Sequence, residues 1–284
     1  MINILFCGND KVFDGMLTTM LSILKRTDTN EPFCFYIYTM DVSHLNPKYL
    51  TLNDYMADIL DKVAKKYNKD NKVIKIDVRD LYDKEFANSP NENCYASPYT
   101  LLRLLADLVP GMPDKLLYLD VDLILNRDIR LLWDQDVTDY EYAAARDQYG
   151  RWLINPNYIN AGVLLFNMKR IRETNLLGKA RKLIRTKKLV FADQSAIIRS
   201  TTKKKMLPQI FNCQSSLTKK TVIRHFSKRL YFLPYPHVAN IKQWHIDDIH
   251  YKLKYHQFDD VLNEYISIMN TYFKEENKNA INQE

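Results

Sequence analysis

Two carboxylates stand directly after an apolar run near the middle of the chain. The stretch DKLLYLDVDLILNRDI, residues 114–129, places Asp120 and Asp122 one residue apart, just after the apolar residues 116–119. A buried carboxylate is unfavourable unless it is paired or bound to a cation. Two oxygen ligands can hold a hard divalent cation that keeps other positions open for phosphate oxygens. The pair is therefore a candidate metal site, and a helix cap or turn is the alternative role.

A second pair with the same spacing, Asp134 and Asp136, follows the residues LLW. Its surroundings are polar and typical of a turn, so we interpret this second pair as structural. What distinguishes the first pair is its position at the end of a continuous apolar strand.

The segments that position the first pair alternate between strand-like and helix-like patterns. Short apolar runs predict strands at 2–6, 33–39, 72–77 and 115–120, and apolar residues at helical spacing predict helices at 15–26, 46–68 and 97–109. Such alternation is typical of parallel strands with helices on both faces, and ligands then bind at the carboxyl ends of the strands. The loop CGND, residues 7–10, and the first carboxylate pair should therefore lie at one edge.

Later segments extend this α/β pattern. We expect strands at 140–146, 160–168 and 221–226, helices at 169–185 and 193–200, and an amphipathic helix at about 249–273. The sequence thus predicts one α/β domain over residues 1–245, with a mainly parallel central sheet flanked by helices. Residues 246–284 should form a C-terminal helical appendage with a polar tail.

Charge is unevenly distributed along the 284 residues, whose formal net charge is +7. Ten acidic and four basic residues lie between Asp107 and Asp147, whereas Lys179 to Leu230 holds fifteen basic residues and one acid, Asp193. A basic half suggests an anionic partner such as nucleotide phosphates, nucleic acid or a membrane surface, and a solvated lysine-rich face is the alternative.

The four cysteines are scattered without a CxxC pair, which favours a reducing cytoplasm and argues against a zinc site. The N-terminus has no pattern of a signal peptide, and no apolar run approaches the ~18 residues of a spanning helix. We therefore expect a cytoplasmic protein.

The stretch YLDVDLILNRDIRLLWDQD resembles glycosyltransferase family 8, the group of glycogenin and bacterial lipooligosaccharide galactosyltransferases. The resemblance continues through INAGVLLFNMKR, ADQSAII, HF and KQW, in that order, over Asn3 to Trp244. It implies the nucleotide-sugar-binding fold called GT-A. It also implies transfer of a hexose, galactose or glucose, from a UDP-sugar with retention of configuration. The implied cofactor is Mn2+, with Mg2+ as the alternative.

The same resemblance implies a set of metal ligands. Asp120 and Asp122 match the family's DxD motif, in which Asp122 would bind the metal most directly and Asp120 would also face the donor. His225, at the end of the strand-like TVIRHF, matches the third ligand, but the glycine that usually follows in the family is missing. His237, five residues before Lys242, is therefore the alternative. The apolar strand before His225 favours His225.

Donor-binding and catalytic residues also follow from the resemblance. The loop that grips the uracil and ribose matches Cys7, Gly8, Asn9 and Asp10. The further donor contacts implied are Arg103, Val121, Asn160, Ala161, Gly162 and Lys242, and Trp244 would pack the closing loop. Asp193 would bind donor hydroxyls, and Gln194 would lie near the anomeric carbon. A helix cap is the alternative for Asp10, Asp14 and Asp193, a surface arginine for Arg103, and a strand bulge for Gly162.

The acceptor implied by bacterial relatives is a saccharide, a glycolipid or a glycoprotein. Basic and aromatic residues late in the chain add the expectation of a peripheral membrane contact.

A glycogenin-like self-glycosylating primer is a variant of this function, for which the nineteen tyrosines are candidate acceptors. Haloacid-dehalogenase-like phosphatases are a second enzyme class with DxD after a strand, but they place it near the first strand. Here the pair follows the fourth predicted strand, which argues against that class. A basic nucleic-acid-binding protein would not need carboxylates at a strand end, so we expect no nucleic acid partner.

Overall fold

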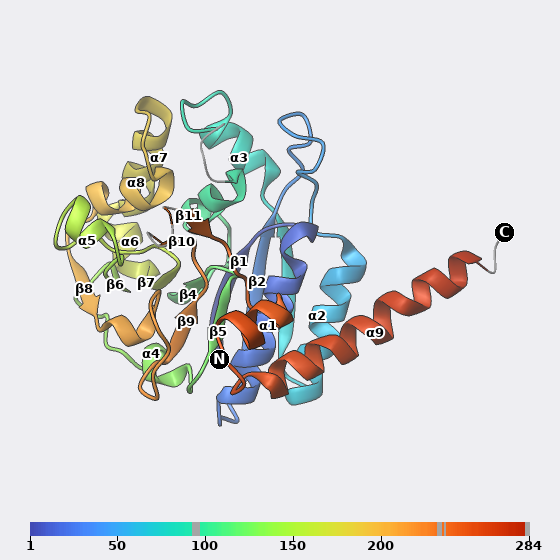
Figure 1. Cartoon of the computed structure of the whole chain (residues 1–284). Coiled ribbons are helices and arrows are strands. Elements are labelled where there is room, and N and C mark those ends of the chain that lie inside the picture. The colour runs from blue at the N-terminus through green and yellow to red at the C-terminus, as the bar shows by residue number, and fades with distance from the viewer. Residues whose placement is uncertain (93–96, 232–234, 236, 282–284) are drawn as a thin grey trace.

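A seven-stranded sheet runs through the centre of the molecule (Figure 1). A computed structural model describes residues 1–92, 97–231, 235 and 237–281. The strand order is β3 (Lys72–Asp77), β2 (Phe33–Thr39), β1 (Ile2–Cys7), β4 (Lys115–Leu119), β7 (Val163–Asn167), β6 (Tyr142–Ala145) and β8 (Lys204–Leu207). Of these seven described strands, only β7 runs antiparallel to its neighbours. The prediction of a mainly parallel sheet is confirmed.

Helices cover both faces of the sheet. One apolar core packs α1 (Phe13–Arg26), α2 (Asp54–Tyr67), α4 (Arg130–Trp133) and α9 (Asp259–Ile281) against one face. The other core packs α3 (Arg79–Phe86), the 3₁₀ helix Pro98–Leu105, α6 (Met168–Thr174), α7 (Leu176–Thr186) and α8 (Ala192–Ser200) against the opposite face. Because the central strands are buried on both sides, they read in the sequence as continuous apolar runs.

Several helix predictions need correction. The helix expected at 46–68 begins at Asp54, where Asn53 Oδ1 accepts a hydrogen bond from Tyr55 N at 2.7 Å. The segment after Ser97 is a 3₁₀ helix rather than an α-helix. The helix expected at 169–185 is two helices, α6 and α7, because Asn175 adopts a left-handed conformation with φ of 52°. The C-terminal helix starts at Asp259, after a π-helix at Asp248–Lys252, and continues to Ile281.

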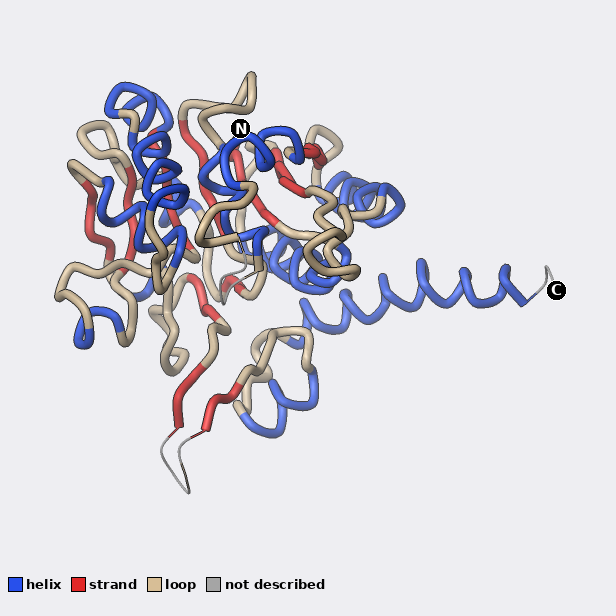
Figure 2. The backbone as a smooth tube through the Cα atoms, turned by 90° about the horizontal axis from the view of Figure 1, so that it is seen from above, coloured by secondary structure: helices blue, strands red, loops and turns tan. Residues whose placement is uncertain are grey.

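Some short elements had no counterpart in the prediction. They are α3, α4, α5 (Gly150–Leu153), β8, β5 (Leu123–Leu125), β10 (Arg229–Tyr231), β11 (His237–Ala239) and the 3₁₀ turns Asp10–Val12 and Gln209–Phe211. The pairing of β5 with β9 (Ile223–His225) is antiparallel and places Leu123 opposite His225. This small sheet joins the turn after β4 to a segment about a hundred residues later. Figure 2 shows the arrangement of helices and strands from above.

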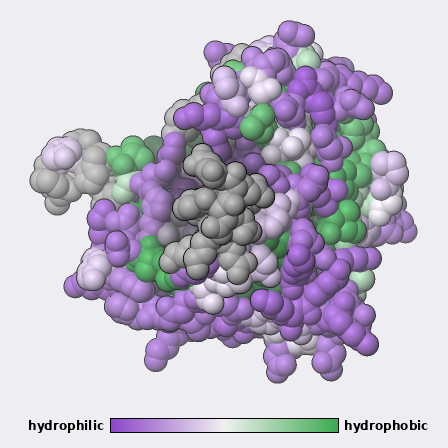
Figure 3. All heavy atoms as spheres, turned by 90° about the vertical axis from the view of Figure 1, so that its right-hand side faces the viewer, coloured by the Kyte–Doolittle hydropathy of each residue, from purple (hydrophilic) through white to green (hydrophobic). Residues whose placement is uncertain are grey.

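The helix α9 crosses α1 and then projects away from the body of the molecule (Figures 1 and 2). Ion pairs of 2.6 Å join Arg26 to Asp260 and Lys25 to Glu264, and Tyr265 donates a hydrogen bond of 2.9 Å to Asp14. Figure 3 shows a mainly hydrophilic surface on this side, with hydrophobic residues in small groups. Among the described residues, no helix has both the length and the apolar character that a membrane crossing demands. The domain boundary at residue 245 stays a prediction.

Candidate active site

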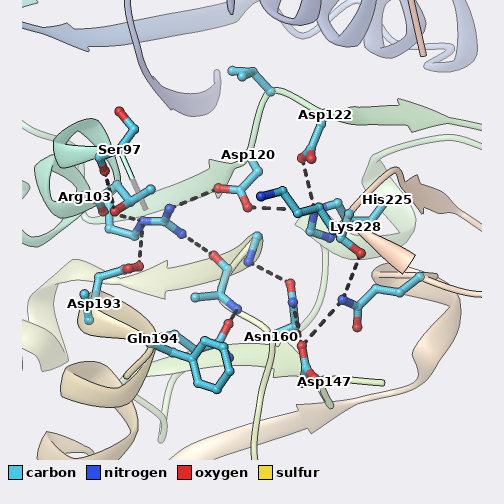
Figure 4. Close-up of a pocket in the computed structure, with 18 of the residues that line it drawn as sticks. Ser97, Arg103, Asp120, Asp122, Asp147, Asn160, Asp193, Gln194, His225 and Lys228 are labelled. Atoms are coloured by element: carbon cyan, nitrogen blue, oxygen red, sulfur yellow. Dashed lines mark hydrogen bonds and ion pairs between the residues drawn. The ribbon is translucent and has the colours of Figure 1, made fainter. Parts of the chain in front are cut away.

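A cavity of about 870 Å³ opens where β1 and β4 end, at the edge that the alternating pattern predicts. Residues from widely separated parts of the chain line it. They include Cys7, Gly8, Asn9, Arg103, Asp120, Val121, Asp122, Asn160, Ala161, Gly162, Asp193, Gln194, His225 and Lys242. These are all of the site residues predicted above except Asp10. Figure 4 shows how several of them converge.

The two carboxylates of the first pair lie close to His225, just beyond the carboxyl end of β4. His225 Nε2 lies 3.0 Å from Asp122 Oδ1 and 3.9 Å from Asp120 Oδ2. One ligand atom from each residue lies within 4.8 Å of the other two. A Cβ atom at Gly162 would lie 2.5 Å from His225 Cε1 and 2.7 Å from Asp120 Oδ2, so only glycine fits beside this cluster. The alternative ligand His237 falls in β11, but its side chain lies outside the described residues.

Asp122 is shared between His225 and a lysine. Lys242 Nζ donates to Asp122 Oδ2 at 2.6 Å and to Phe226 O at 3.0 Å. Burial opposes ionisation of Asp122, but the nearby His225 and Lys242 outweigh it and hold the pKa of Asp122 far below its usual value. The carboxylate is therefore ionised and available to a cation.

Lys242 is held at the cavity by the two residues that follow it. Gln243 is fully buried and donates a hydrogen bond of 2.9 Å to Val121 O, the backbone oxygen between the two carboxylates. A Cβ atom at Gly15 in α1 would lie 2.8 Å from Trp244 Cζ3, so Trp244 packs closely on the α1 backbone. The KQW segment therefore closes over the DxD turn, although it follows His225 later than the family pattern requires.

A chain of side-chain hydrogen bonds orients His225 from behind. His225 Nδ1 lies 2.9 Å from Asn212 Oδ1, Asn212 Nδ2 donates to Asn160 Oδ1 at 2.9 Å, and Asn160 Nδ2 donates to Asp147 Oδ2 at 2.9 Å. An amide oxygen and an ionised carboxylate can only accept, so the proton of His225 in this chain must sit on Nδ1. Nε2 is the other ring nitrogen and faces Asp120 and Asp122, so it is the atom of His225 that would ligate a metal.

Arg103 is buried between two carboxylates on the other side of the cavity. Its guanidinium lies 3.1 Å from Asp120 Oδ1 and 3.2 Å from Asp193 Oδ2, and it donates to Ala161 O at 2.6 Å. Its centre also lies 4.0 Å from the centroid of the Tyr118 ring. Arg103 is 3% exposed, which excludes the alternative of a surface arginine.

Burial has opposite consequences for the two members of the Arg103–Asp193 pair. Desolvation raises the pKa of Asp193, while the charge of Arg103 counteracts it. Desolvation lowers the pKa of Arg103, but Tyr118, Asp193 and Asp120 outweigh it, so the net shift is upward. Arg103 is therefore charged and stabilises the ionised form of Asp193.

The two residues of the DQ pair sit in the first turn of α8 and face the cavity (Figure 4). The helix N-cap is Phe191, so the alternative role of Asp193 as an N-cap is wrong. Gln194 Oε1 accepts a hydrogen bond of 3.0 Å from Ala161 N. This contact aligns the NAG segment with α8.

In the loop after β1, residues 7–9 line the cavity, whereas Asp10 contacts the start of α2. Asn9 is 4% exposed, and its Nδ2 donates to Lys48 O and to Tyr99 Oη, both at 3.2 Å. Asp10 turns away, because its Oδ1 accepts a hydrogen bond of 2.6 Å from Asn53 N at the start of α2. Among the described cavity lining, this loop contributes Cys7, Gly8 and Asn9 without Asp10.

Sequence reasoning missed several residues of the site. Asp147 follows β6 as Asp120 follows β4, so its place near a strand end was a signal that could have found it. Asn212 and Gln214 lie in an irregular segment before β9, which carries no such signal. Gln214 Oε1 accepts from Gln148 N at 2.9 Å and so secures the turn that carries Asp147.

Comparison with known proteins identifies the family. The sequence model described as glycosyl transferase family 8 matches residues 3–248. The chain belongs to this family. Membership confirms the resemblance that the DxD, NAG and DQ segments suggested, and it covers every segment that lines the cavity.

Two curated proteins are similar to this family 8 chain in sequence. A Haemophilus influenzae protein named as a glycosyltransferase is 26% identical over 189 residues, which cover 63% of this chain and 52% of that protein. Glycosyltransferase GlyA of Streptococcus pneumoniae is 38% identical over 106 residues, 34% of this chain and 15% of that protein. The chain therefore spans about half or less of the length of these relatives.

Solved structures confirm the GT-A fold. The galactosyltransferase LgtC, in complex with donor and acceptor sugar analogues, superposes with a TM-score of 0.64 at 17% identity, over 93% of this chain and 96% of that one. The glycosyltransferase GlyE of Streptococcus pneumoniae gives a TM-score of 0.59 at 19% identity, over 94% of this chain and 64% of that one. At these identities the likeness concerns the fold.

Proposed function

We propose that this chain is a metal-dependent, retaining hexosyltransferase that moves galactose or glucose from a UDP-sugar to a saccharide, glycolipid or glycoprotein acceptor. The observation that carries the proposal is the convergence of Asp120, Asp122 and His225 at a cavity in a family 8 fold. The three residues come from two segments about a hundred positions apart, and a purely structural role for the carboxylates would not need the histidine.

The ligand atoms of Asp120, Asp122 and His225 fit a divalent metal ion of intermediate hardness. Two carboxylate oxygens and one imidazole nitrogen face one another, and the hydrogen-bonded chain behind His225 leaves Nε2 as the ligating nitrogen. Mn2+ accepts both oxygen and imidazole ligands, whereas Mg2+ favours oxygen alone, so Mn2+ is the better match. When bound, the metal would neutralise the charge that develops on the UDP leaving group.

Two cations of the chain would assist at the diphosphate. Lys242 pairs with Asp122 at 2.6 Å in this structure, and its flexible side chain can reach phosphate oxygens placed beside the metal. Arg103 is fixed between Asp120 and Asp193, so it positions those carboxylates and presents positive charge to the cavity. The nucleoside would lie against Cys7, Gly8 and Asn9.

The sugar would lie against the small residues that begin β7. Ala161 and Gly162 leave room for a hexose beside the backbone, and Asp193 would accept hydrogen bonds from its hydroxyls. The Asn160 side chain is occupied by Gly162 N, Asn212 and Asp147, so its role is to hold this segment in place. Tyr118 donates to Asp120 at 2.6 Å and supports the same wall.

Retention of configuration needs either two inversions or attack from the face that the leaving group departs. An amide is a poor nucleophile, which argues against a glycosyl-enzyme formed on Gln194. We favour same-face attack by the acceptor, with Gln194 beside the developing positive charge on the sugar. The Gln194 amide is already oriented by Ala161 N.

A reducing, cytoplasmic location fits the chemistry of the chain, and the peripheral membrane contact stays a prediction from the basic and aromatic residues late in the chain. Cys7, Cys34 and Cys213 are buried as free thiols. Nucleic acid is not the expected partner, since part of the basic half is paired within the fold. Arg181 lies 2.5 Å from Asp107, and Arg185 lies 2.5 Å from Glu85.

The decisive experiment incubates the full chain with Mn2+ and a panel of UDP-sugars and measures UDP release. We expect release from UDP-galactose or UDP-glucose that requires metal and that disappears in Asp122→Asn. An unchanged rate in Asp122→Asn, or binding of UDP without any need for metal, would contradict the proposal.

A further inference from the structure

A second group of metal-ligating side chains lies outside the cavity, where α9 begins. His250 Nε2 lies 2.8 Å from Asp259 Oδ1, and His256 Nδ1 lies 3.7 Å from Asp259 Oδ2. The two imidazole rings stack with centroids 4.9 Å apart and planes 22° apart. Each residue offers one ligand atom within 4.8 Å of the others, and none of the three lines the cavity.

The backbone holds these three residues in place. His250 follows the fully buried Ile249 in the π-helix, and Asp259 follows the fully buried Phe258. Lys254 adopts a left-handed conformation with φ of 55°, which is rare for a residue with a side chain and reverses the chain direction. Tyr255 N then donates to Ile249 O at 3.0 Å, and this bond brings His256 back beside His250. Packing and backbone bonds therefore fix the ligand-bearing loop before any ion binds.

The chemistry of this group suits a borderline transition metal. Imidazole nitrogen is a favoured ligand of Zn2+, Co2+ and Ni2+, and one carboxylate completes a three-ligand set with the remaining position left to water. Each carboxylate oxygen of Asp259 faces a nitrogen of one imidazole, so a small movement of side chains brings three ligand atoms around a single ion. The exposed fractions of the side chains are 28% for His250, 67% for His256 and 42% for Asp259, so an ion can enter from solvent.

We propose that His250, His256 and Asp259 form a second metal site that binds Zn2+ or a similar transition-metal ion independently of the cavity. Its ligands are two imidazoles and one carboxylate, the reverse of the two carboxylates and one imidazole in the cavity. The site takes a softer ion than the hard, phosphate-binding cation of the cavity.

An ion at this site would fasten the first turn of α9 to the segment that follows Trp244. From there α9 is tied to α1 through Asp260 with Arg26 and Glu264 with Lys25. The metal would thus stabilise the position of the C-terminal helix on the body of the protein (Figure 2). Its loss is expected to loosen α9 without removing any group from the cavity.

Titration of the full chain with Co2+, followed by its visible absorption and by calorimetry, tests the proposal. Because the cavity would itself take up Co2+, the test is made in Asp122→Asn: we expect one ion that this variant retains and that the double variant Asp122→Asn/His256→Ala loses, since His256 is mostly exposed and its removal leaves the fold intact. His245→Ala is the matched control, because His245 is a nearby half-exposed histidine that contacts Asp248 rather than the cluster. Uptake that survives in Asp122→Asn/His256→Ala, or that is abolished when His245→Ala is added to Asp122→Asn, would overturn the proposal.

Thermal unfolding gives a second readout. With free Zn2+ at about a hundred times the Kd, linkage predicts a rise in Tm of roughly 5 °C for a chain of this size. The rise should appear in Asp122→Asn, whose cavity ligand is removed, but not in Asp122→Asn/His256→Ala. An equal Zn2+ effect on these two variants would mean that His250, His256 and Asp259 bind no ion and would overturn the proposal.

Discussion

The chain contains two Asp-x-Asp pairs of identical spacing, and the structure puts them to different uses. Asp120 and Asp122 follow β4 into the cavity, where Arg103, Lys242 and His225 surround them. The second pair lies at the surface: Asp134 contacts Arg130 at 3.4 Å, and Asp136 accepts hydrogen bonds of 2.9 and 2.6 Å from Thr138. Spacing alone therefore does not make a metal site.

The two pairs differ in the residues that tertiary structure brings next to them. The first pair gains a histidine through the antiparallel pairing of β5 with β9, and glycine at position 162 leaves room for all three side chains. The second pair caps a local turn with its own neighbours in sequence. A carboxylate pair becomes a candidate cation site when distant parts of the chain converge on it.

The largest expected effect comes from removing one carboxylate of each pair. Asp122→Asn should lower Mn2+-dependent UDP affinity by more than about 100-fold, because losing a direct ligand costs more than losing an outer partner. Asp136→Asn, at the matching position of the second pair, should leave this affinity unchanged. Calorimetric titration with UDP and Mn2+ measures both, and equal losses in the two variants would refute the distinction.

The second largest effect is a loss of stability, and it follows from replacing the arginine that contacts each pair. Arg103→Gln leaves Asp120 and the buried Asp193 without their cation, which should cost about 3–5 kcal/mol of unfolding free energy. Arg130→Gln removes an exposed ion pair to Asp134 and should cost less than ~1 kcal/mol. Urea unfolding compares them, and similar costs would contradict the difference in burial.

A smaller effect is expected from the hydrogen-bonded chain that only the first pair possesses among the described contacts. Asn212→Leu removes the acceptor of His225 Nδ1–H, and Mn2+ affinity should fall roughly 10–100-fold. Asn212→Asp keeps that acceptor but cannot donate to Asn160, so we expect a loss between those of wild type and Asn212→Leu. The ¹⁵N chemical shifts of His225 report its tautomer, and a wild-type pattern in Asn212→Leu would remove Asn212 from this role.

The smallest effect is the acid sensitivity of the second pair. Hydrogen bonds from Thr138 lower the pKa of Asp136, so its contribution to stability is full above the unfolded pKa of about 3.9 and is lost as pH falls toward the folded pKa. The free energy of unfolding of Asp136→Asn should therefore fall slightly less steeply than that of wild type as the pH drops below about 4. Asp122→Asn should flatten the same curve more, because His225 and Lys242 lower the pKa of Asp122. Indistinguishable curves for the two variants would argue against this ranking.

Much of the fold and site was accessible from the sequence because it depends on strand ends. The apolar runs of β1 and β4 gave the positions of Cys7–Asn9 and of Asp120 and Asp122, since parallel strands deliver their carboxyl ends to one edge. The family resemblance added the NAG and DQ segments, which lie far away in sequence and have no strong periodic signal of their own.

The remaining features depend on contacts that periodicity does not encode. Asp10 fits a nucleoside role by position, but the start of α2 at Asp54 places the backbone N–H of Asn53 within its reach. Asn212 lies in an irregular segment, and its role follows from the fold that puts it between His225 and Asn160. His250 and His256 fall within the single helix predicted at about 249–273, whereas in the structure the chain turns at the left-handed Lys254 and the two rings stack.

The pairing of β5 with β9 also has a consequence for synthesis of the protein. Its two strands meet at residues 123 and 225, so the ribosome must deliver about a hundred further residues after the carboxylates before the histidine arrives. The strands β1 to β4 can associate meanwhile, since their contacts are complete within the first 119 residues. A partly made chain therefore holds two carboxylates without their third partner, and if the three residues bind a metal as proposed, only a chain translated past His225 can bind it.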